Sequence, residues 1–318
     1  MIHTENLTKK YGNVLALDAL NLNIGEKEIF GYIGPNGAGK TTTIRILSGL
    51  LRPTSGKAEV AGIDVVAHPD RAKEVVGYMP DSFGVYRGMR VWEYLDFFAA
   101  AYRIPRARRK TSVDEVLAVT GVDAMKDYYV DSLSHGMQQR VGIARTLVHG
   151  PKVLFLDEPT SGLDPRARIE MRQLLRSLKE LGKTILVSSH ILPELATLCD
   201  RIGIIEQGRL LLCDTMEKVL KQVEERRIIE IEMLKDSPRA VDYLKSAYPA
   251  AKLEIKDVIG RLLRLSFAGS DQEVCDLLAG LVKNGYPVFW YREVPLELER
   301  VYLKVTAEAK AGARRVEP

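Results

Sequence analysis

One glycine-rich segment limits the possible folds of this chain more than any other feature. It lies between a predicted strand, residues 28–33, and a predicted helix, residues 40–50, and it fits the pattern G-x-x-x-x-G-K-[ST]. Glycines in such a turn let successive backbone N–H groups converge on phosphate oxygens, and the N-terminus of the following helix adds unpaired donors. We therefore expect a nucleotide to bind at these residues: Gly34, Pro35, Asn36, Gly37, Ala38, Gly39, Lys40, Thr41 and Thr42.

Two side chains of this segment are expected to act together with an acidic pair further along the chain. Lys40 would reach the outer phosphates, and the hydroxyl of Thr41 would bind Mg²⁺. Residues 153–156 form an apolar run, typical of a strand buried on both faces, and the run ends in Asp157 and Glu158. Asp157 would hold the metal, and Glu158 would orient and deprotonate the water that attacks the γ-phosphate. The alternative is that the two acids only cap the strand.

A histidine completes the set of catalytic candidates. His190 follows another predicted strand, residues 184–188, and the carboxyl ends of parallel strands are where ligands bind in such sheets. An imidazole there can donate a hydrogen bond to the γ-phosphate, although a lone histidine after a strand is more often a structural hydrogen-bonding group. The catalytic candidates are thus Lys40, Glu158 and His190.

Composition excludes several classes of protein. The 318 residues include 46 Lys and Arg and 42 Asp and Glu, and this net charge of +4 predicts no nucleic-acid partner. The stretch without a charged side chain at residues 29–39 is shorter than the roughly 18 apolar residues of a membrane span, and the first residues predict no secretory signal. Three cysteines, spaced unlike any zinc or redox motif, predict free thiols in a reducing compartment.

The order of apolar patterns predicts an α/β domain with a largely parallel sheet over residues 2–212, because strand-like runs alternate with helical patterns. The stretch 85–150 has helical patterns without a convincing strand, so we expect a helical subdomain inserted between sheet strands. The predicted strands are 28–33, 57–61, 75–79, 153–156, 184–188 and 202–206, and the predicted helices are 40–50, 91–103, 113–120, 135–149, 165–181 and 192–199.

A second domain is predicted beyond a boundary near residues 219–227. Its pattern of strand, helix, strand, strand, helix and strand is that of the ferredoxin-like split β-α-β fold. We expect a nucleotide-binding domain over 1–218, a smaller α+β domain over 226–307 and a flexible tail over 308–318. No catalytic set is recognisable in the smaller domain, and dimerisation, ligand sensing and bracing all stay open as its role. Its elements are predicted at 228–234, 238–248, 252–257, 261–267, 271–284 and 287–292, with a last helix at 296–306.

Residues 133–140, Leu-Ser-His-Gly-Met-Gln-Gln-Arg, lie between the glycine-rich loop and the acidic pair. They resemble the signature LSGGQ-x-Q-R of the ATP-binding subunits of ABC transporters, and the resemblance covers about residues 1–215. It implies a P-loop NTPase core of the ABC ATPase type, with ATP and Mg²⁺ as cofactors. It further implies that Tyr11 stacks on adenine, that residues 161–164 form the D-loop and that His190 is the switch histidine.

The same resemblance implies a head-to-tail pair of nucleotide-binding subunits, expected to be a homodimer. ATP would lie between the glycine-rich loop of one subunit and the signature of the other, where Ser134, Gly136 and the D-loop residue Asp164 contribute to its site. Two departures from the family pattern stand out. Asp81 occupies the place of a usual glutamine, so any metal contact there would come from a carboxylate. His135 and Met137 occupy the places of glycine and glutamine in the signature.

A nucleotide-binding subunit without a membrane span implies a separate permease. Residues 298–306 and 77–95 resemble the corresponding segments of the type-two export subclass, which pairs with such permeases, and the aromatic residues of the helix after residue 90 would in part face the permease. Plain core packing is the alternative for each of these aromatics. A basic cluster in a predicted loop beside Pro105 is either a solvated surface or a contact with anionic headgroups; its members are Arg103, Arg106, Arg108, Arg109 and Lys110.

These observations lead to one functional expectation and one alternative. We expect an ATP-hydrolysing subunit of an ABC transporter, peripheral at the cytoplasmic face of the cell membrane, that couples dimer closure to transport, with export the implied direction. The alternative is a soluble ABC ATPase that is not coupled to transport. The transported substrate cannot be inferred, because its selection belongs to the permease.

Overall fold

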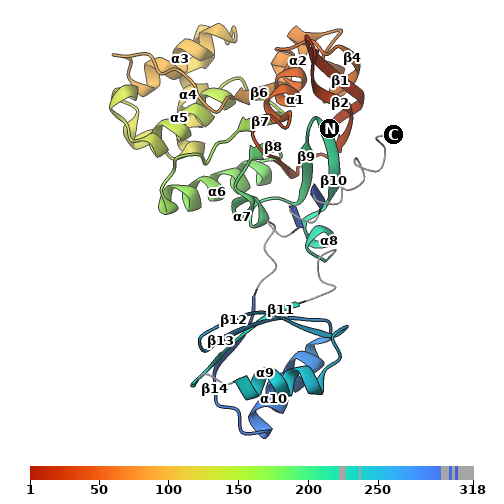
Figure 1. The fold of residues 1–318 in the computed structure, drawn as a ribbon. Helices are drawn as coiled ribbons and strands as arrows, with labels where there is room; N and C mark the ends of the chain where they lie inside the picture. The colour runs from red at the N-terminus through yellow and green to blue at the C-terminus, as the bar shows by residue number, and fades with distance from the viewer. Residues whose placement is uncertain (222–226, 236–237, 295–300, 303–304, 307–318) are drawn as a thin grey trace. The chain divides into compact units, whose positions relative to one another are not determined.

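The computed structural model describes residues 1–221, 227–235, 238–294, 301–302 and 305–306 (Figure 1). The chain divides into two compact units, Met1–Met216 and Glu217–Lys304, and the described residues Val305 and Thr306 belong to the first. In these described ranges, no helix has both the length and the apolar character needed to cross a membrane. The predicted tail at 308–318 lies outside the described residues, as does most of the predicted helix at 296–306.

The larger unit is built on a six-stranded sheet. Its strands lie in the order β10 (Arg209–Thr215), β9 (Arg201–Glu206), β3 (Ile29–Ile33), β8 (Thr184–Ser189), β7 (Val153–Asp157) and β6 (Val76–Met79). All neighbours from β9 to β6 are parallel, and β10 joins as an antiparallel edge. The central strands β3, β7 and β8 are buried along their whole length, since helices cover both faces of the sheet. The expectation of a largely parallel α/β sheet is therefore confirmed.

A second sheet of the larger unit is antiparallel, and most of it escaped the sequence analysis. Its order is β2 (Val14–Ile24), β1 (Ile2–Tyr11), β4 (Ser55–Val60) and β5 (Ile63–Asp64). Register shifts interrupt the pairing of β1 with β2 three times, so the alternation of apolar and polar residues that marks a half-buried strand is broken. The strand expected near 57–61 belongs to this sheet and not to the parallel one.

Helices cover the parallel sheet and connect its strands. α1 (Lys40–Leu47) and α6 (Pro165–Glu180) lie on opposite sides of the sheet (Figure 1). Asp164 caps α6 by accepting a hydrogen bond from the Ala167 N–H at 2.9 Å. Two shorter helices are α2 (Pro69–Val75) and α7 (Leu192–Ala196), and α7 is shorter than the predicted 192–199. α8 (Met216–Lys221) begins at the residue where the Met1–Met216 segment of the larger unit ends.

The chain between β6 and β7 is helical, as expected. It forms α3 (Val91–Ala101), α4 (Arg106–Thr120) and α5 (His135–Leu147), with two short 3₁₀ turns, η1 (Asp123–Met125) and η2 (Val130–Ser132). The predicted start of α4 at residue 113 is wrong, and so is the predicted loop for the basic cluster. Four of the five cluster residues lie in the first turns of α4, where no buried apolar residue precedes Val113 and the periodic signal is absent.

The smaller unit has the predicted ferredoxin-like arrangement. Its sheet order is β12 (Leu253–Ile259), β13 (Leu262–Phe267), β11 (Arg227–Met233) and β14 (Val288–Val294), with every neighbouring pair antiparallel. Helices α9 (Pro238–Ala247) and α10 (Asp271–Lys283) pack on one face of this sheet (Figure 1). Ile229, Ile231, Leu244 and Leu277, all fully buried, form the centre of its core.

Candidate nucleotide-binding site

The glycine-rich segment connects β3 to α1 in a tight turn. Gly39 precedes α1 and has a φ of 110°, a backbone conformation that residues with a Cβ rarely adopt. A Cβ at Gly39 would lie 2.7 Å from the carbonyl oxygen of Ala16, and one at Gly34 would lie 2.4 Å from the carbonyl oxygen of Ile205. Because backbone from two other strands approaches so closely, only glycine fits at these two positions of the loop.

Lys40 starts α1 and lies almost completely buried, with 7% of its side chain exposed. Its ammonium group donates to the carbonyl oxygens of Gly34 at 2.6 Å and Pro35 at 3.3 Å, and it lies 3.7 Å from a carboxylate oxygen of Glu158. Burial lowers the pKa of Lys40, while the carboxylates of Glu158 and Asp157 oppose that shift. The Lys40 ammonium is thus held inside the loop by two neutral carbonyl groups and the Glu158 carboxylate, and phosphate oxygens can replace the carbonyl groups as its partners.

Asp157 ends β7 and is fixed by two hydroxyl groups. The Thr41 hydroxyl donates to Oδ2 at 2.7 Å, and the Ser188 hydroxyl donates to Oδ1 at 2.5 Å. Asp157 and Ser188 are paired across the parallel ladder of β7 and β8, which explains why they meet. The sequence analysis missed Ser188, although it lies two residues before the candidate His190 and ends a predicted strand. Hydroxyl and carboxylate oxygens side by side are the donors that Mg²⁺ prefers.

Glu158 and His190 form a hydrogen-bonded pair beside Lys40. The backbone of Glu158 has a φ of 52°, and its N–H points back to the hydroxyl and carbonyl oxygens of Ser188, both at 3.2 Å. This turn directs the carboxylate away from β7, so that Oε2 lies 2.8 Å from Nδ1 of His190. Since a carboxylate only accepts, Nδ1 of His190 carries the donated proton. The Glu158 side chain is 12% exposed and that of His190 is 51% exposed.

Lys40, Asp157 and Glu158 line one pocket of about 200 Å³, and His190 is not among its lining residues. The pocket brings together most of the predicted phosphate-binding residues with Asp157, Glu158 and Asp81, and it adds Ala16, which the sequence analysis did not predict. Ala16 lies on β2, a strand without a sequence signal, so nothing in the sequence indicated it. The lining residues are Ala16, Pro35, Asn36, Gly37, Gly39, Lys40, Thr41, Thr42, Asp81, Asp157 and Glu158.

Gly34 and Ala38 belong to the loop but do not line this pocket, and the other predicted binding residues lie elsewhere. Tyr11 ends β1 with 47% of its surface exposed, and the Lys9 ammonium lies 5.1 Å from its ring centre. Ser134 caps α5 by accepting a hydrogen bond from the Met137 N–H at 3.4 Å. Ser134, Gly136 and Asp164 line a different pocket of about 580 Å³, which shares no residue with the phosphate pocket. Within one chain, the structure therefore does not bring the signature to the glycine-rich loop.

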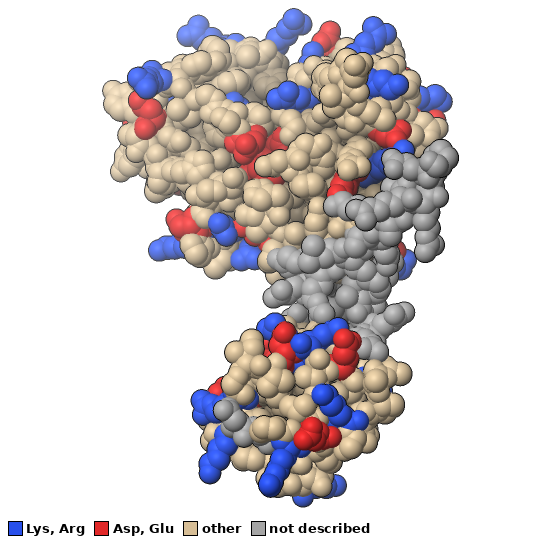
Figure 2. Space-filling model, viewed as in Figure 1, with Lys and Arg blue, Asp and Glu red and all other residues tan. Residues whose placement is uncertain are grey.

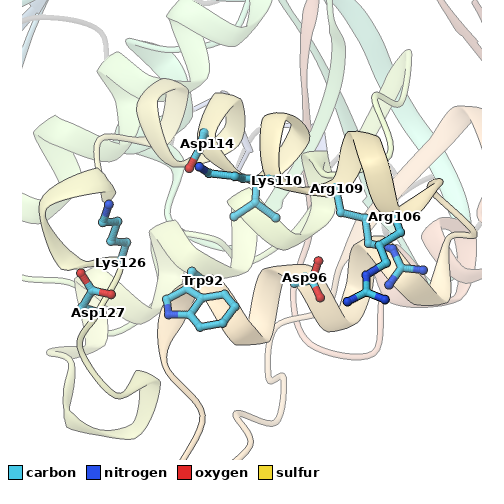
Figure 3. Close-up of a pocket in the computed structure, with 9 residues that line it drawn as sticks. Trp92, Asp96, Arg106, Arg109, Lys110, Asp114, Lys126 and Asp127 are labelled. Atoms are coloured by element: carbon cyan, nitrogen blue, oxygen red, sulfur yellow. The ribbon is translucent and has the colours of Figure 1, made fainter.

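A pocket of about 460 Å³ lies between α3 and α4, away from both of these sites (Figure 3). Trp92 of α3 faces it, and Arg106 and Arg109 of α4 extend toward Asp96 (Figure 3). Lys and Arg side chains project from the surface over α3 and α4 (Figure 2). Three of the five cations of the basic cluster thus share this pocket with acidic groups. The lining residues are Trp92, Asp96, Arg106, Arg109, Lys110, Val113, Asp114, Lys126 and Asp127.

Comparisons with known proteins agree with this geometry. A family model described as ABC transporter matches residues 17–161. The bacitracin transport ATP-binding protein BcrA of Bacillus licheniformis is 40% identical over 98% of this chain and 99% of its own length. The chain belongs to the ABC transporter family. The linearmycin resistance ATP-binding protein LnrL of Bacillus subtilis is similarly related to this ABC subunit, with 30% identity over 96% of this chain and 98% of its own.

Solved structures resemble the nucleotide-binding part of the ABC subunit. CbiO1 from Clostridium perfringens matches with a TM-score of 0.64 and 31% identity over 70% of this chain and 91% of its own. The dimeric bacterial ABC transporter cassette MJ0796 matches with a TM-score of 0.61 and 29% identity over 68% of this chain and 99% of its own. The chain is therefore an ATP-binding subunit of an ABC transporter, and it is an ATPase.

Proposed function

We propose that this subunit hydrolyses ATP at the pocket between the glycine-rich loop and Glu158, and that ATP-driven closure of a head-to-tail homodimer drives export through a separate permease. The observation that carries the proposal is the contact of three groups from three separate segments. Lys40, Glu158 and His190 meet at the carboxyl edge of the parallel sheet, with the Lys40 ammonium and Nδ1 of His190 on opposite oxygens of one carboxylate. That arrangement supplies a phosphate ligand, a base and a group that orients the base.

Each of the three groups has a distinct role in the proposed reaction. Lys40 exchanges its carbonyl partners for the outer phosphates of ATP and neutralises their charge. The Glu158 carboxylate orients water and takes its proton as the water attacks the γ-phosphate. His190 donates from Nδ1 to Glu158 and thereby keeps the carboxylate aimed, and its exposed ring can reach the γ-phosphate from the other nitrogen. Because Lys40 and Glu158 are little exposed to water, the interactions of Lys40 with the phosphates and of Glu158 with His190 are stronger than they would be at the surface.

Magnesium fits the donors beside the phosphates. Thr41 and Asp157 would hold Mg²⁺, since their oxygen atoms lie together in the pocket and no cationic side chain among the described residues pairs with either. The ion would neutralise charge on the phosphates when bound. Asp81 lines the same pocket and would add a third oxygen donor or position water.

The separation of the signature from the phosphate pocket supports the dimer. Ser134 and Gly136 lie beside Asp164 in their own pocket, and a second copy of the chain would bring them to ATP held by the first. Unpaired N–H groups at the start of α5 would then bind the γ-phosphate across the interface, with Tyr11 stacking on the adenine of its own subunit. Because ATP makes contacts in the closed pair that it lacks in the open pair, binding shifts the equilibrium toward closure.

Two relatives support export as the direction, and we further propose a peripheral place for the subunit at the cytoplasmic face of the membrane. One relative bears the name of a bacitracin transport protein and another that of a linearmycin resistance protein, and both align along nearly their whole length. We assign residues 1–218 to the nucleotide-binding domain and 226–307 to an accessory domain. The two compact units divide the chain after Met216, and the described residues Val305 and Thr306 belong to the first unit.

Purification of the tagged full-length chain from membranes tests the proposal. We expect a membrane-spanning permease to co-purify and the complex to release phosphate from ATP in a Mg²⁺-dependent manner, with release abolished by Lys40→Ala. Co-purification with ribosomes and with no membrane protein would instead support the alternative, an ABC ATPase that is not coupled to transport.

A further inference from the structure

His135 makes a contact that joins two functional segments of this chain. Its Nε2 lies 3.1 Å from the carbonyl oxygen of Ser161, the first residue of the D-loop at 161–164. A carbonyl oxygen only accepts, so Nε2 carries the proton and the imidazole donates. Glycine, the residue usual in the ABC signature at this position, has no side chain and cannot make this bond. The departure at His135 therefore creates a link that a standard signature lacks.

The D-loop makes close contact with the imidazole. Gly162 has a φ of 70°, and a Cβ there would lie 3.3 Å from Nε2 of His135. On the other side of the signature turn, a Cβ at Gly136 would lie 3.2 Å from the Cβ of Ala167 in α6. The turn and the D-loop thus pack tightly, and the bond from His135 is the polar contact between residues 133–137 and 161–164 within the part of the chain that the structure describes.

Ser161 extends the link to the catalytic base of the same subunit. Its backbone N–H donates to the carbonyl oxygen of Glu158 at 3.1 Å, while its own carbonyl oxygen accepts from His135. A continuous set of bonds therefore runs from Glu158, beside the subunit's own ATP, to the turn that holds Ser134. In the head-to-tail dimer, on which this step rests, Ser134 contacts the ATP of the partner. Each subunit then connects the two ATP sites through one imidazole.

We propose that His135 is a positioning residue that couples the two ATP sites of the dimer, by moving the signature turn together with the D-loop. Coupling of this kind means that ATP at one site changes the free energy of binding at the other. His135→Gly removes the bond and uncouples the two segments. Glutamine restores it, because its side-chain amide can donate to the Ser161 carbonyl from nearly the position of Nε2.

The test compares wild type, His135→Gly and His135→Gln as purified full-length chains. The readout is phosphate release as a function of ATP concentration, at a protein concentration that supports dimers. We expect a wild-type Hill coefficient clearly above 1, with an upper limit of about 2 for two sites. We expect His135→Gly to lower it to about 1 and His135→Gln to keep it within about a tenth of wild type. Melting temperatures should agree to within about 4 °C among the three chains, since the imidazole is exposed and its replacement removes one hydrogen bond.

Four results would overturn the inference. A wild-type Hill coefficient of 1 with normal turnover would show that the two ATP sites are not coupled. A wild-type Hill coefficient in His135→Gly would show that coupling does not need the bond. An equally reduced Hill coefficient in His135→Gln would show that coupling does not depend on an N–H donor at this position. Absence of ATP turnover in the wild-type chain itself would refute the proposed function, and this inference with it.

Discussion

Replacement of Glu158 by glutamine separates ATP binding from ATP hydrolysis. The amide has the size of the carboxylate, and the backbone of residue 158 keeps its hydrogen bonds to Ser188, since these use its N–H and not its side chain. The glutamine carbonyl can still accept from Nδ1 of His190. The pocket should therefore hold ATP as before while lacking a group that can take a proton from water.

The size of the effect follows from the role of a general base. Such groups contribute a factor of about 10²–10⁴ to the rate, which corresponds to about 3–5 kcal/mol of activation free energy. We expect kcat of Glu158→Gln to decrease by a factor of about 10²–10⁴. The affinity for ATP should be unchanged or higher, because a negative charge near the phosphates is lost. Glu180→Gln, on the exposed face of α6, is the matched control and should retain wild-type turnover.

The hydrogen bond to His190 adds a second measurable consequence. If His190 acts by aiming Glu158, the turnover rate of the double variant Glu158→Gln/His190→Ala should be no more than about threefold below that of Glu158→Gln. The reason is that the effects of two substitutions do not add when the two groups act as a unit. Phosphate release at saturating ATP is measured for wild type, Glu158→Gln, His190→Ala and the double variant. Turnover of Glu158→Gln above about a third of wild type, or multiplicative losses in the double variant, would refute this reasoning.

Three further predictions concern stability and surface contacts. Gly142→Ala should destabilise the fold by about 1–3 kcal/mol, because its Cβ would lie 2.4 Å from the Phe83 ring, whereas Gly84→Ala meets no atom within 4 Å and should leave the melting temperature unchanged. Burial lowers the pKa of His149 to about 4, so the stability that its neutral form provides is complete above about pH 6.5 and is lost as the pH falls toward 4. Urea unfolding should show a loss of up to about 3 kcal/mol across that window, reduced in His149→Gln; an equal loss in the variant would assign it to other groups. Replacing all five residues of the basic cluster by glutamine should weaken flotation of the chain with anionic vesicles by tenfold or more, at about 1 kcal/mol for each cation at the surface, and unchanged flotation would show a merely solvated surface.

Local sequence patterns predicted much of the fold, and each wrong or missed element has a physical cause. The ferredoxin-like order of the smaller unit followed from strands and helices that alternate cleanly along the chain. β1 and β2 escaped notice because irregular pairing breaks their alternation, and Ala16 of the pocket went unnoticed with them. The start of α4 was misplaced because its first turn is a run of exposed cations and carries no apolar period.

By itself, the sequence determined the phosphate loop, the buried acidic strand and the family signature, because each consists of residues that are neighbours along the chain. Only the tertiary structure decided how these parts meet. Ser188 binds Asp157 and His190 binds Glu158 because β7 and β8 pair in one parallel register, across about thirty residues of intervening chain. The contact of His135 with Ser161 likewise depends on how α5 packs against the D-loop, which no spacing along the sequence encodes.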